Sequence, residues 1–271
     1  MKPAKLKKLV ITAAGKGTRL LPLTQFQSKE TLPILNVPAI FYLVNEAVDA
    51  GIEEIYIVVN SLKNQLTKYF NDLDAVIKTL QKHNQTFEAE LLIKAKKVKI
   101  AFVVQKKYKG IGAALLSAKS YLKNKPFALF LGDEVFLSNE PQISKCVDLF
   151  NNLNQSVVGL CPVNIKDVNK YGIAEVDSQN NLVLVEEKPH SVNTNEPLSV
   201  CGRYVFTSNI FSYLKPLNDI VCLTKAMNAM SKVEKINTVK LDPTSRCDLG
   251  SIAGILKANQ MASKRFVDLE D

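Results

Sequence analysis

Short apolar runs alternate with helix-length segments along the first half of the chain. Between the first run and the second, the segment 38–50 places apolar side chains at helical spacing, with a proline at its start and Gly51 after its end. A strand, a helix and a second strand in this order connect through a right-handed crossover and form a parallel sheet. The runs that we predict to be its buried strands are 9–11, 54–59, 98–104 and 127–131.

The segment between the second and third runs breaks this alternation. Ser61 can cap a helix that continues to Phe70, and Asp74 can cap a longer helix that extends through Phe87. We predict that residues 61–97 form a helical insertion between two neighbouring strands of the sheet.

The pattern changes in the second half of the chain. After a helix at 141–150 and a strand at 157–163, turn residues separate short strands, which predicts antiparallel pairing. The later elements are strands at 171–176, 182–187 and 200–206, helices at 208–214 and 222–230, a strand at 238–241 and a helix at 251–262. We therefore predict one α/β domain over residues 1–271, with a Rossmann-like, mostly parallel sheet flanked by helices and a small antiparallel layer at about 164–250.

The length, composition and net charge of the chain agree with a globular protein that acts on anionic molecules. At 271 residues and 46% apolar composition the chain can bury a large core, and its net charge of +9 favours phosphorylated small molecules or nucleic acid as partners. Basic residues cluster at 2–8 and 94–109, but aromatic residues make up only 7% of the chain and no nucleic-acid-binding motif accompanies them. We therefore expect no binding to nucleic acid.

Cysteine usage indicates a reducing compartment. The five cysteines are widely spaced, form no C-x-x-C pair and have only His83 and His190 as additional ligands for a zinc site. No apolar stretch of signal-peptide length precedes the first glycine-rich loop, and no apolar run is long enough to span a membrane. These features favour a cytoplasmic protein with reduced thiols and no membrane association.

A candidate phosphate-binding loop follows the first strand. The sequence there is Ala-Ala-Gly-Lys-Gly-Thr-Arg, residues 13–19. Gly15 and Gly17 lack a Cβ, so their backbone can take positive φ and bring N–H groups close to an anion, while Arg19 and Lys29 add positive charge. Neither the Walker motif nor the dinucleotide-binding fingerprint fits this loop. The alternative is a flexible connection between a strand and a helix, with solvated cations.

Other polar residues follow strands that end at the same edge of the sheet. Gln105 and the turn that contains Gly110 and Gly112 follow the third strand, and Asp133 follows the fourth. Because ligands collect at the carboxyl ends of parallel strands, these residues and the glycine-rich loop should border one crevice. Asp133, together with Asp248 from far along the chain, is a candidate pair of Mg²⁺ ligands, although either Asp can instead cap the turn that follows it.

The stretch Lys8–Pro33 as a whole resembles the signature of the sugar nucleotidyltransferases. The shared features are two small residues before Gly-x-Gly-Thr-Arg, a lysine about ten residues later, and a following Leu-Pro. The resemblance covers nearly the whole chain. It is strongest to the bacterial UTP:glucose-1-phosphate uridylyltransferases, because of Leu21–Thr24, Val44–Glu46 and the helical insertion.

The resemblance implies Mg²⁺-assisted transfer of a uridylyl group from UTP to glucose 1-phosphate, by attack of the sugar phosphate on the α-phosphorus. That nucleophile is already anionic, so no general base is required. The resemblance also implies a homo-oligomer, either a dimer or a tetramer. The residues that match the family's site are Arg19, Lys29 and Lys188 as catalytic cations; Ala13, Ala14, Gly15, Gly17, Thr18, Gln105, Gly110 and Gly112 for the nucleotide; Gly172, Glu187 and Lys188 for the sugar; and Asp133 and Asp248 for the metal.

Some positions depart from the pattern of this subgroup. Ser28 replaces the usual proline, Ala113 replaces a histidine, and residues 131–133 and 186–188 look more like the thymidylyltransferases that use dTTP. Residues 219–225 lack several polar groups that line the sugar side in the family. The open alternatives are therefore dTTP or another nucleotide, another hexose 1-phosphate, or a catalytically silent sugar-nucleotide-binding protein.

Overall fold

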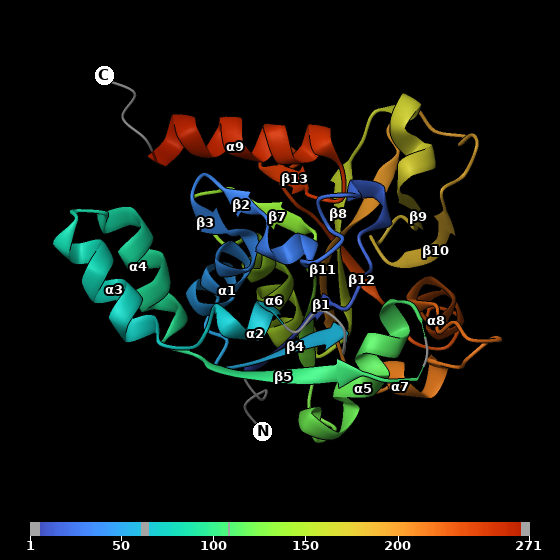
Figure 1. The fold of residues 1–271 in the computed structure, drawn as a ribbon. Coiled ribbons are helices and arrows are strands. Elements are labelled where there is room, and N and C mark those ends of the chain that lie inside the picture. The colour runs from blue at the N-terminus through green and yellow to red at the C-terminus, as the bar shows by residue number, and fades with distance from the viewer. Residues whose placement is uncertain (1–5, 61–64, 108, 267–271) are drawn as a thin grey trace.

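The computed structural model describes residues 6–60, 65–107 and 109–266, and a mixed β-sheet runs through its centre (Figure 1). Its strands lie in the order β10, β9, β11, β6, β1, β4 and β5, while β8 pairs with β11 and β12 pairs with β8. Their bounds are β1 Lys8–Ala13, β4 Glu54–Asn60, β5 Lys99–Gln105, β6 Phe127–Leu131, β8 Val157–Pro162, β9 Gly172–Val176, β10 Leu182–Glu187, β11 Leu198–Phe206 and β12 Asn237–Lys240. Helices flank this sheet, so the predicted α/β fold class is confirmed.

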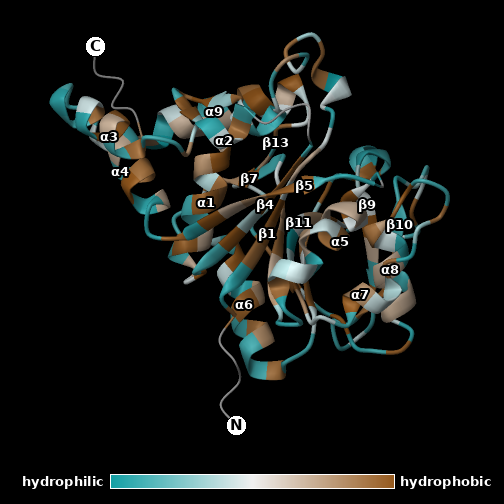
Figure 2. Ribbon diagram, turned by 60° about the horizontal axis from the view of Figure 1, so that its bottom comes forward, coloured by the Kyte–Doolittle hydropathy of each residue, from teal (hydrophilic) through white to brown (hydrophobic). Residues whose placement is uncertain are grey.

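Helices cover both faces of the parallel half of the sheet. β1 pairs in parallel with β4 and β6, and β4 pairs in parallel with β5. Leu9 and Ile11 pack in one hydrophobic cluster with helix α1 (Ala39–Asp49), whereas Val10 packs in the other with helix α5 (Ile111–Leu122). Because both faces of β1 are buried, its sequence is a continuous apolar run, and Figure 2 shows hydrophobic residues along the central strands.

Strand β11 joins the antiparallel half of the sheet to the parallel half. Its last residues pair antiparallel with β6, and its first residues pair antiparallel with β9, which in turn pairs with β10. Its pairing with β8 is irregular between Val200 and Tyr204, where Gly202 has a φ of 63°. Glycine adopts this left-handed conformation without strain, so the bulge lets one strand serve both halves. The predicted antiparallel strands therefore extend the central sheet.

The segment between β4 and β5 is helical. Its helices are α2 (Gln65–Lys68), α3 (Leu73–Lys82) and α4 (Thr86–Ala95). The prediction of one long helix through Phe87 is wrong, because Asn84 has a left-handed φ of 57°. The N–H of Gln85 donates to the carbonyl of Leu80 at 2.9 Å, a bond that closes α3 before α4 begins.

The predicted helix caps in this segment also differ from the structure. Asp74 is not a cap, because it lies in the first turn of α3 and forms an ion pair with Lys96. The other predicted cap, Ser61, lies outside the described residues.

Two short strands bring a distant part of the chain to the carboxyl edge of the sheet. β7 (Glu134–Phe136) and β13 (Arg246–Asp248) pair antiparallel, so that Asp248 lies opposite Glu134. The apolar pattern does not predict them, because each is three residues long. Helix α9 (Ile252–Phe266) follows β13 and extends beyond its predicted end at residue 262.

Among the remaining elements, α6 (Gln142–Leu153) packs against β8 and β11, and the others are short. These others are β2 Pro33–Ile34, β3 Val37–Pro38, α7 Ile210–Tyr213, α8 Leu223–Met230 and the 3₁₀ turns η1 Thr18–Leu20, η2 Lys29–Thr31 and η3 Ile165–Lys170. No helix among the described residues has the length and apolar character needed to cross a membrane.

Candidate active site

A cavity of about 370 Å³ opens where β1, β5 and β6 end. Residues from β9, β10 and α8 form its opposite wall, so both halves of the sheet contribute to it. This is the crevice that the converging strand ends predict. The predicted site residues that line it are Ala14, Gly15, Arg19, Lys29, Gln105, Gly110, Asp133, Gly172, Glu187, Lys188 and Asp248.

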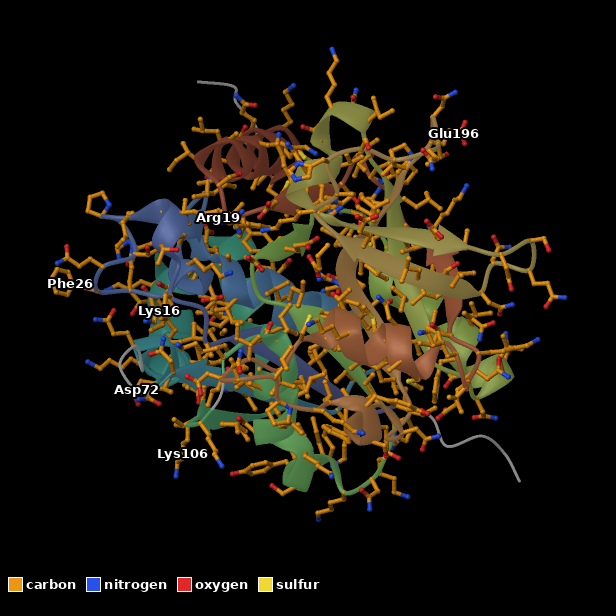
Figure 3. All side chains as sticks on the ribbon, turned by 90° about the vertical axis from the view of Figure 1, so that its right-hand side faces the viewer. Lys16, Arg19, Phe26, Asp72, Lys106 and Glu196 are labelled. Atoms are coloured by element: carbon orange, nitrogen blue, oxygen red, sulfur yellow. The ribbon has the colours of Figure 1, made fainter. Side chains whose placement is uncertain are left out.

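The other predicted nucleotide-binding residues lie outside this cavity. Ala13 is buried in β1, and Gly17 and Thr18 line a smaller neighbouring cavity of about 180 Å³ together with Arg19 and Lys29. Figure 3 labels Lys16, in the loop between β1 and η1, and Arg19, in η1 itself.

Gly112, also predicted to bind the nucleotide, contacts Val221 and does not line the larger cavity. Its N–H donates to the carbonyl of Val221 at 3.1 Å, and a Cβ at this position would lie 2.7 Å from the Val221 side chain. Gly112 therefore allows α5 to pack closely against the segment before α8. Gly110, at the start of α5, is the glycine of this turn that borders the cavity.

Glycine is required at position 17 for the loop to keep its shape. Gly17 has a φ of +69°, and a Cβ there would lie 3.0 Å from the side chain of Thr24. The Thr24 hydroxyl donates to the carbonyl of Gly17 at 2.6 Å and so fixes the turn. A Cβ at Gly15 would lie 3.7 Å from Lys29 Nζ, which places the loop backbone beside the lysine. The glycine-containing backbone and a cation thus lie side by side, an arrangement that suits an anion site.

Lys29 and Asp133 form an ion pair on the floor of the cavity. The ammonium donates to Asp133 Oδ2, and the side chains of Lys29 and Asp133 are only 15% and 19% exposed. Burial acts to lower the pKa of Lys29, but the carboxylates of Asp133 and Glu30 outweigh it and hold this pKa above its ordinary value. Burial likewise acts to raise the pKa of Asp133, and Lys29 overcomes it to hold that pKa low. Both groups are therefore charged at neutral pH.

Glu30 is a further carboxyl group beside this pair. Its side chain is fully buried, and neither carboxyl oxygen has a hydrogen-bond partner among the described residues. Lys29 Nζ lies 4.0 Å from Glu30 Oε1, and burial raises the pKa of Glu30 to about 7. The sequence analysis missed this residue. The signal was its place directly after Lys29, but its burial depends on how η2 packs under β6.

Asp133 and Asp248 line the same cavity, as a shared metal would require. The N–H of Leu249 donates to the carbonyl of Asp133 at 2.7 Å, so the two aspartates follow adjoining segments of backbone. Within the described residues no group of three or more His, Cys, Asp or Glu side chains is placed to hold a metal ion. Two carboxylates suit Mg²⁺, because it accepts few protein ligands and keeps other positions for water and phosphate oxygens. The residues present therefore fit Mg²⁺.

Glu134 and Arg246 connect this pair of strands to the other wall of the cavity. Arg246 Nε donates to Glu134 Oε2 at 2.7 Å, and Arg246 Nη1 donates to Ser199 Oγ at 2.7 Å. The guanidinium lies 4.6 Å from the ring centre of Tyr171, which lines the cavity. A buried cation thus holds together β7, β13, β11 and the start of β9.

The wall opposite the phosphate loop carries Glu187 and Lys188. The hydroxyl of Thr224 donates to Glu187 Oε1, and a Cβ at Gly172 would lie 3.6 Å from the same oxygen. Lys188 has a left-handed φ of 51°, and its N–H donates to the carbonyl of Tyr171 at 2.9 Å. A non-glycine residue in this conformation is uncommon and often marks a functional position. Thr224 is a second residue that the sequence analysis did not single out.

The unusual segment 219–225 contributes little to the cavity. Within it, only Leu223 and Thr224 are among the lining residues. Ile220 is 52% exposed, and Lys225 is exposed on the surface of α8. Most residues of this segment therefore lie outside the cavity lining.

Comparison with known proteins identifies the family. Residues 8–265 match the profile of a family described as Nucleotidyl transferase. The chain belongs to this family. A UTP--glucose-1-phosphate uridylyltransferase from Mycoplasma genitalium is 36% identical to this nucleotidyl transferase over 277 residues, which cover 98% of this chain and 94% of the relative.

Solved structures of nucleotidyl transferases have the same fold. A crystal structure of a UDP-glucose pyrophosphorylase complexed with UDP-glucose superposes with a TM-score of 0.81 and 30% identity, covering 96% of this chain and 99% of the other. A UTP-bound UGPase from Acinetobacter baumannii has a TM-score of 0.85 and 28% identity, covering 97% of this chain and 95% of that one. The agreement over nearly the full length extends to both walls of the cavity.

Proposed function

We propose that this nucleotidyl transferase transfers the uridylyl group of UTP to glucose 1-phosphate, giving UDP-glucose and pyrophosphate. The observation that carries the proposal is one cavity bordered by the phosphate loop and Lys29 on one wall and by Glu187 and Lys188 on the other. Relatives with this activity, and solved relatives with UTP or UDP-glucose bound, support the choice of substrates.

The reaction is an in-line displacement at the α-phosphorus. An oxygen of the sugar phosphate forms the new bond to phosphorus, and the bond between that phosphorus and the oxygen bridging to the β-phosphate breaks. The electron pair of the broken bond leaves on pyrophosphate. Because the attacking oxygen is already anionic, the site needs to supply position and positive charge rather than a base.

The described residues can supply both the positioning and the positive charge. Arg19 and the loop at residues 14–18 bind the β- and γ-phosphates, and Lys29 reaches the triphosphate from beside Gly15. Lys188 binds the phosphate of the sugar, and Glu187, oriented by Thr224, accepts hydrogen bonds from sugar hydroxyls.

The remaining roles in the proposal are binding of the uracil and of the metal ion. Gln105 and Gly110 face the uracil, since a side-chain amide and a backbone group can each select hydrogen-bond partners. Asp133 and Asp248 would hold Mg²⁺, which neutralises charge on the phosphate oxygens when bound.

We extend the proposal to the organisation of the chain. Residues 1–271 act as one nucleotidyltransferase domain, with α2 to α4 as an insertion and the β9–β10 hairpin as its sugar-side part. The chain assembles as a dimer or tetramer, which light scattering on the purified protein measures directly.

The test is pyrophosphate release with Mg²⁺ and glucose 1-phosphate, offering UTP, dTTP, ATP, CTP and GTP in parallel. We expect turnover with UTP, which Asp133→Ala abolishes. Preference for dTTP would move the protein to the thymidylyltransferases with the same mechanism. Binding of UTP without release of pyrophosphate from any nucleotide would contradict the proposal and leave a binding role.

A further inference from the structure

A second cavity, of about 580 Å³, adjoins the reaction cavity. It lies between η3, β13 and the first turn of α9, and Figure 1 shows this end of α9 on the side of the molecule that carries β8 and β9. We call it the basic annex. Its charged lining residues are Arg19, Lys170, Lys188, Arg246, Lys257 and Asp248.

Arg19 stands at the junction between the annex and the reaction site. It lines the reaction cavity, the annex and the small cavity at Gly17 and Thr18. A Cβ at Gly250 would lie 2.6 Å from Arg19 Nη2, so the guanidinium lies against the backbone at this glycine. Tyr171 also lines both large cavities. An anion held by Arg19 would therefore border both cavities.

The cations of the annex are only partly neutralised by the protein. Lys170 pairs with Asp167, and Arg246 pairs with Glu134. Within the described residues, no carboxylate forms an ion pair with Arg19, Lys188 or Lys257. Coulomb attraction at such a site favours a multiply charged anion.

Lys257 is positioned to bind such an anion. Its ammonium donates to the carbonyl of Arg246 at 2.7 Å, which holds an otherwise flexible side chain at the annex. It lies on the second turn of α9, whose start also lines the annex through Ser251 and Gly254. The partial positive charge at the start of a helix acts in the same direction as Lys257.

We infer that the basic annex binds inorganic pyrophosphate as it leaves the reaction cavity, and receives it when the reaction runs in reverse. The inference rests on the proposed function, because pyrophosphate is the leaving group formed beside Arg19. Pyrophosphate carries several negative charges and no apolar part, which matches an annex whose lining includes five cations, one carboxylate and the start of a helix.

The kinetic test compares Lys257→Ala with Lys264→Ala, an exposed lysine near the end of the same helix and outside the annex. In the reverse reaction, the KM for pyrophosphate should rise about tenfold in Lys257→Ala, while the KM for UDP-glucose stays within about twofold. Lys257→Glu should raise the KM for pyrophosphate further. Equal KM values for pyrophosphate in wild type, Lys257→Ala and Lys264→Ala would overturn the inference.

Calorimetry tests the binding of pyrophosphate to the annex independently of which nucleotide the enzyme uses. Pyrophosphate titrated into the protein without nucleotide should bind about tenfold more weakly to Lys257→Ala than to wild type or Lys264→Ala, whichever nucleotide the enzyme uses. Unchanged affinity in Lys257→Ala, in an enzyme that makes UDP-glucose, would contradict the annex and leave the proposed function standing. A tenfold loss without UDP-glucose synthesis would support the annex and contradict the proposed function.

Discussion

Lys29 shows at the scale of single residues how the cavity is prepared for anionic substrates. It neutralises Asp133, lies 4.0 Å from Glu30, and still borders the cavity from beside Gly15. A lysine in this position is held by its ion pair with Asp133 before substrate arrives, so little side-chain entropy remains to be lost on binding.

Replacing Lys29 tests its role in catalysis. Lys29→Met keeps the length of the side chain and removes the charge, and we expect kcat/KM to fall about a hundredfold, since one such cation contributes on the order of 3 kcal/mol. Lys240→Met, at an exposed position on β12, is the matched control. Steady-state kinetics with both variants measure the effect. Equal activity in Lys29→Met and wild type would remove Lys29 from the mechanism.

Glu30 gives a prediction about pH and stability. Its pKa is about 7 in the folded protein and 4.5 ordinarily, so the folded state keeps a proton that the unfolded state loses. The free energy of unfolding should therefore decrease as pH rises from 4.5 to about 7, by about 3 kcal/mol from this group. Glu30→Gln cannot titrate at this position and should lose that part of the pH dependence.

The measurement is urea unfolding without Mg²⁺ at about pH 5 and about pH 8, in wild type and Glu30→Gln. The drop in unfolding free energy between the two pH values should be smaller in the variant. The same drop in both proteins would show that Glu30 is not a buried, protonated group.

The residues of the site were predictable to different degrees. Gly15, Arg19 and Asp133 could be placed because each follows the end of a buried strand, and such ends converge. Glu30 and Thr224 could not, because their roles depend on tertiary packing: Glu30 is buried against Gly132, and Thr224 reaches Glu187 on strand β10 from helix α8.

At the scale of elements, a buried ion pair joins a central strand to two helices. Arg203 on β11 is fully buried and donates to the carboxylate of Glu46 on α1, from Nε to Oε1 at 3.0 Å and to Oε2 at 3.2 Å, and from Nη2 to Oε2 at 2.6 Å. Glu46 also accepts the N–H of Ile143, at the start of α6. One carboxylate therefore fixes a strand and two helices.

Breaking this pair should be costly. Arg203→Met leaves Glu46 buried without its cation, and we expect the free energy of unfolding to fall by about 3 to 5 kcal/mol. Lys7→Met removes the exposed Lys7–Glu53 pair instead and should cost less than about 1 kcal/mol. Chemical denaturation compares the two variants. Similar losses of unfolding free energy in the two variants would show that the buried Arg203–Glu46 pair stabilises the fold no more than the exposed Lys7–Glu53 pair does.

Gly254 tests the placement of α9. Alanine usually favours a helix over glycine, but a Cβ at this position would lie 1.7 Å from the carbonyl oxygen of Asp248. Gly254→Ala should therefore displace the first turn of α9 from Asp248 and raise the Mg²⁺ concentration needed for half-maximal activity several-fold. Ser263→Ala, farther along α9, is the control. An unchanged Mg²⁺ requirement would show that α9 does not position Asp248.

Elements with a long apolar pattern were predictable, and short ones were not. β4 was found from its continuous apolar run, whereas β7 and β13 have three residues each and pair only with each other. The division of the insertion into α3 and α4 depends on the left-handed conformation of Asn84, which a helical pattern of apolar residues does not reveal.

At the scale of the whole molecule, the site exists because one sheet joins two halves. The parallel half supplies the phosphate loop and Asp133, and the antiparallel half supplies Glu187 and Lys188 across the cavity. The class of fold was predictable from the alternation of strands and helices. The continuity of the sheet through β11 was not, because it depends on the bulge at Gly202.

The most direct test of the whole account is ³¹P NMR of UTP and glucose 1-phosphate mixed with the protein and Mg²⁺. The account predicts that UDP-glucose and pyrophosphate appear in equal amounts, and that the isosteric Asp133→Asn variant forms neither at a comparable rate. UTP and glucose 1-phosphate that remain unchanged with the wild-type protein, or products that form equally fast with Asp133→Asn, would contradict it.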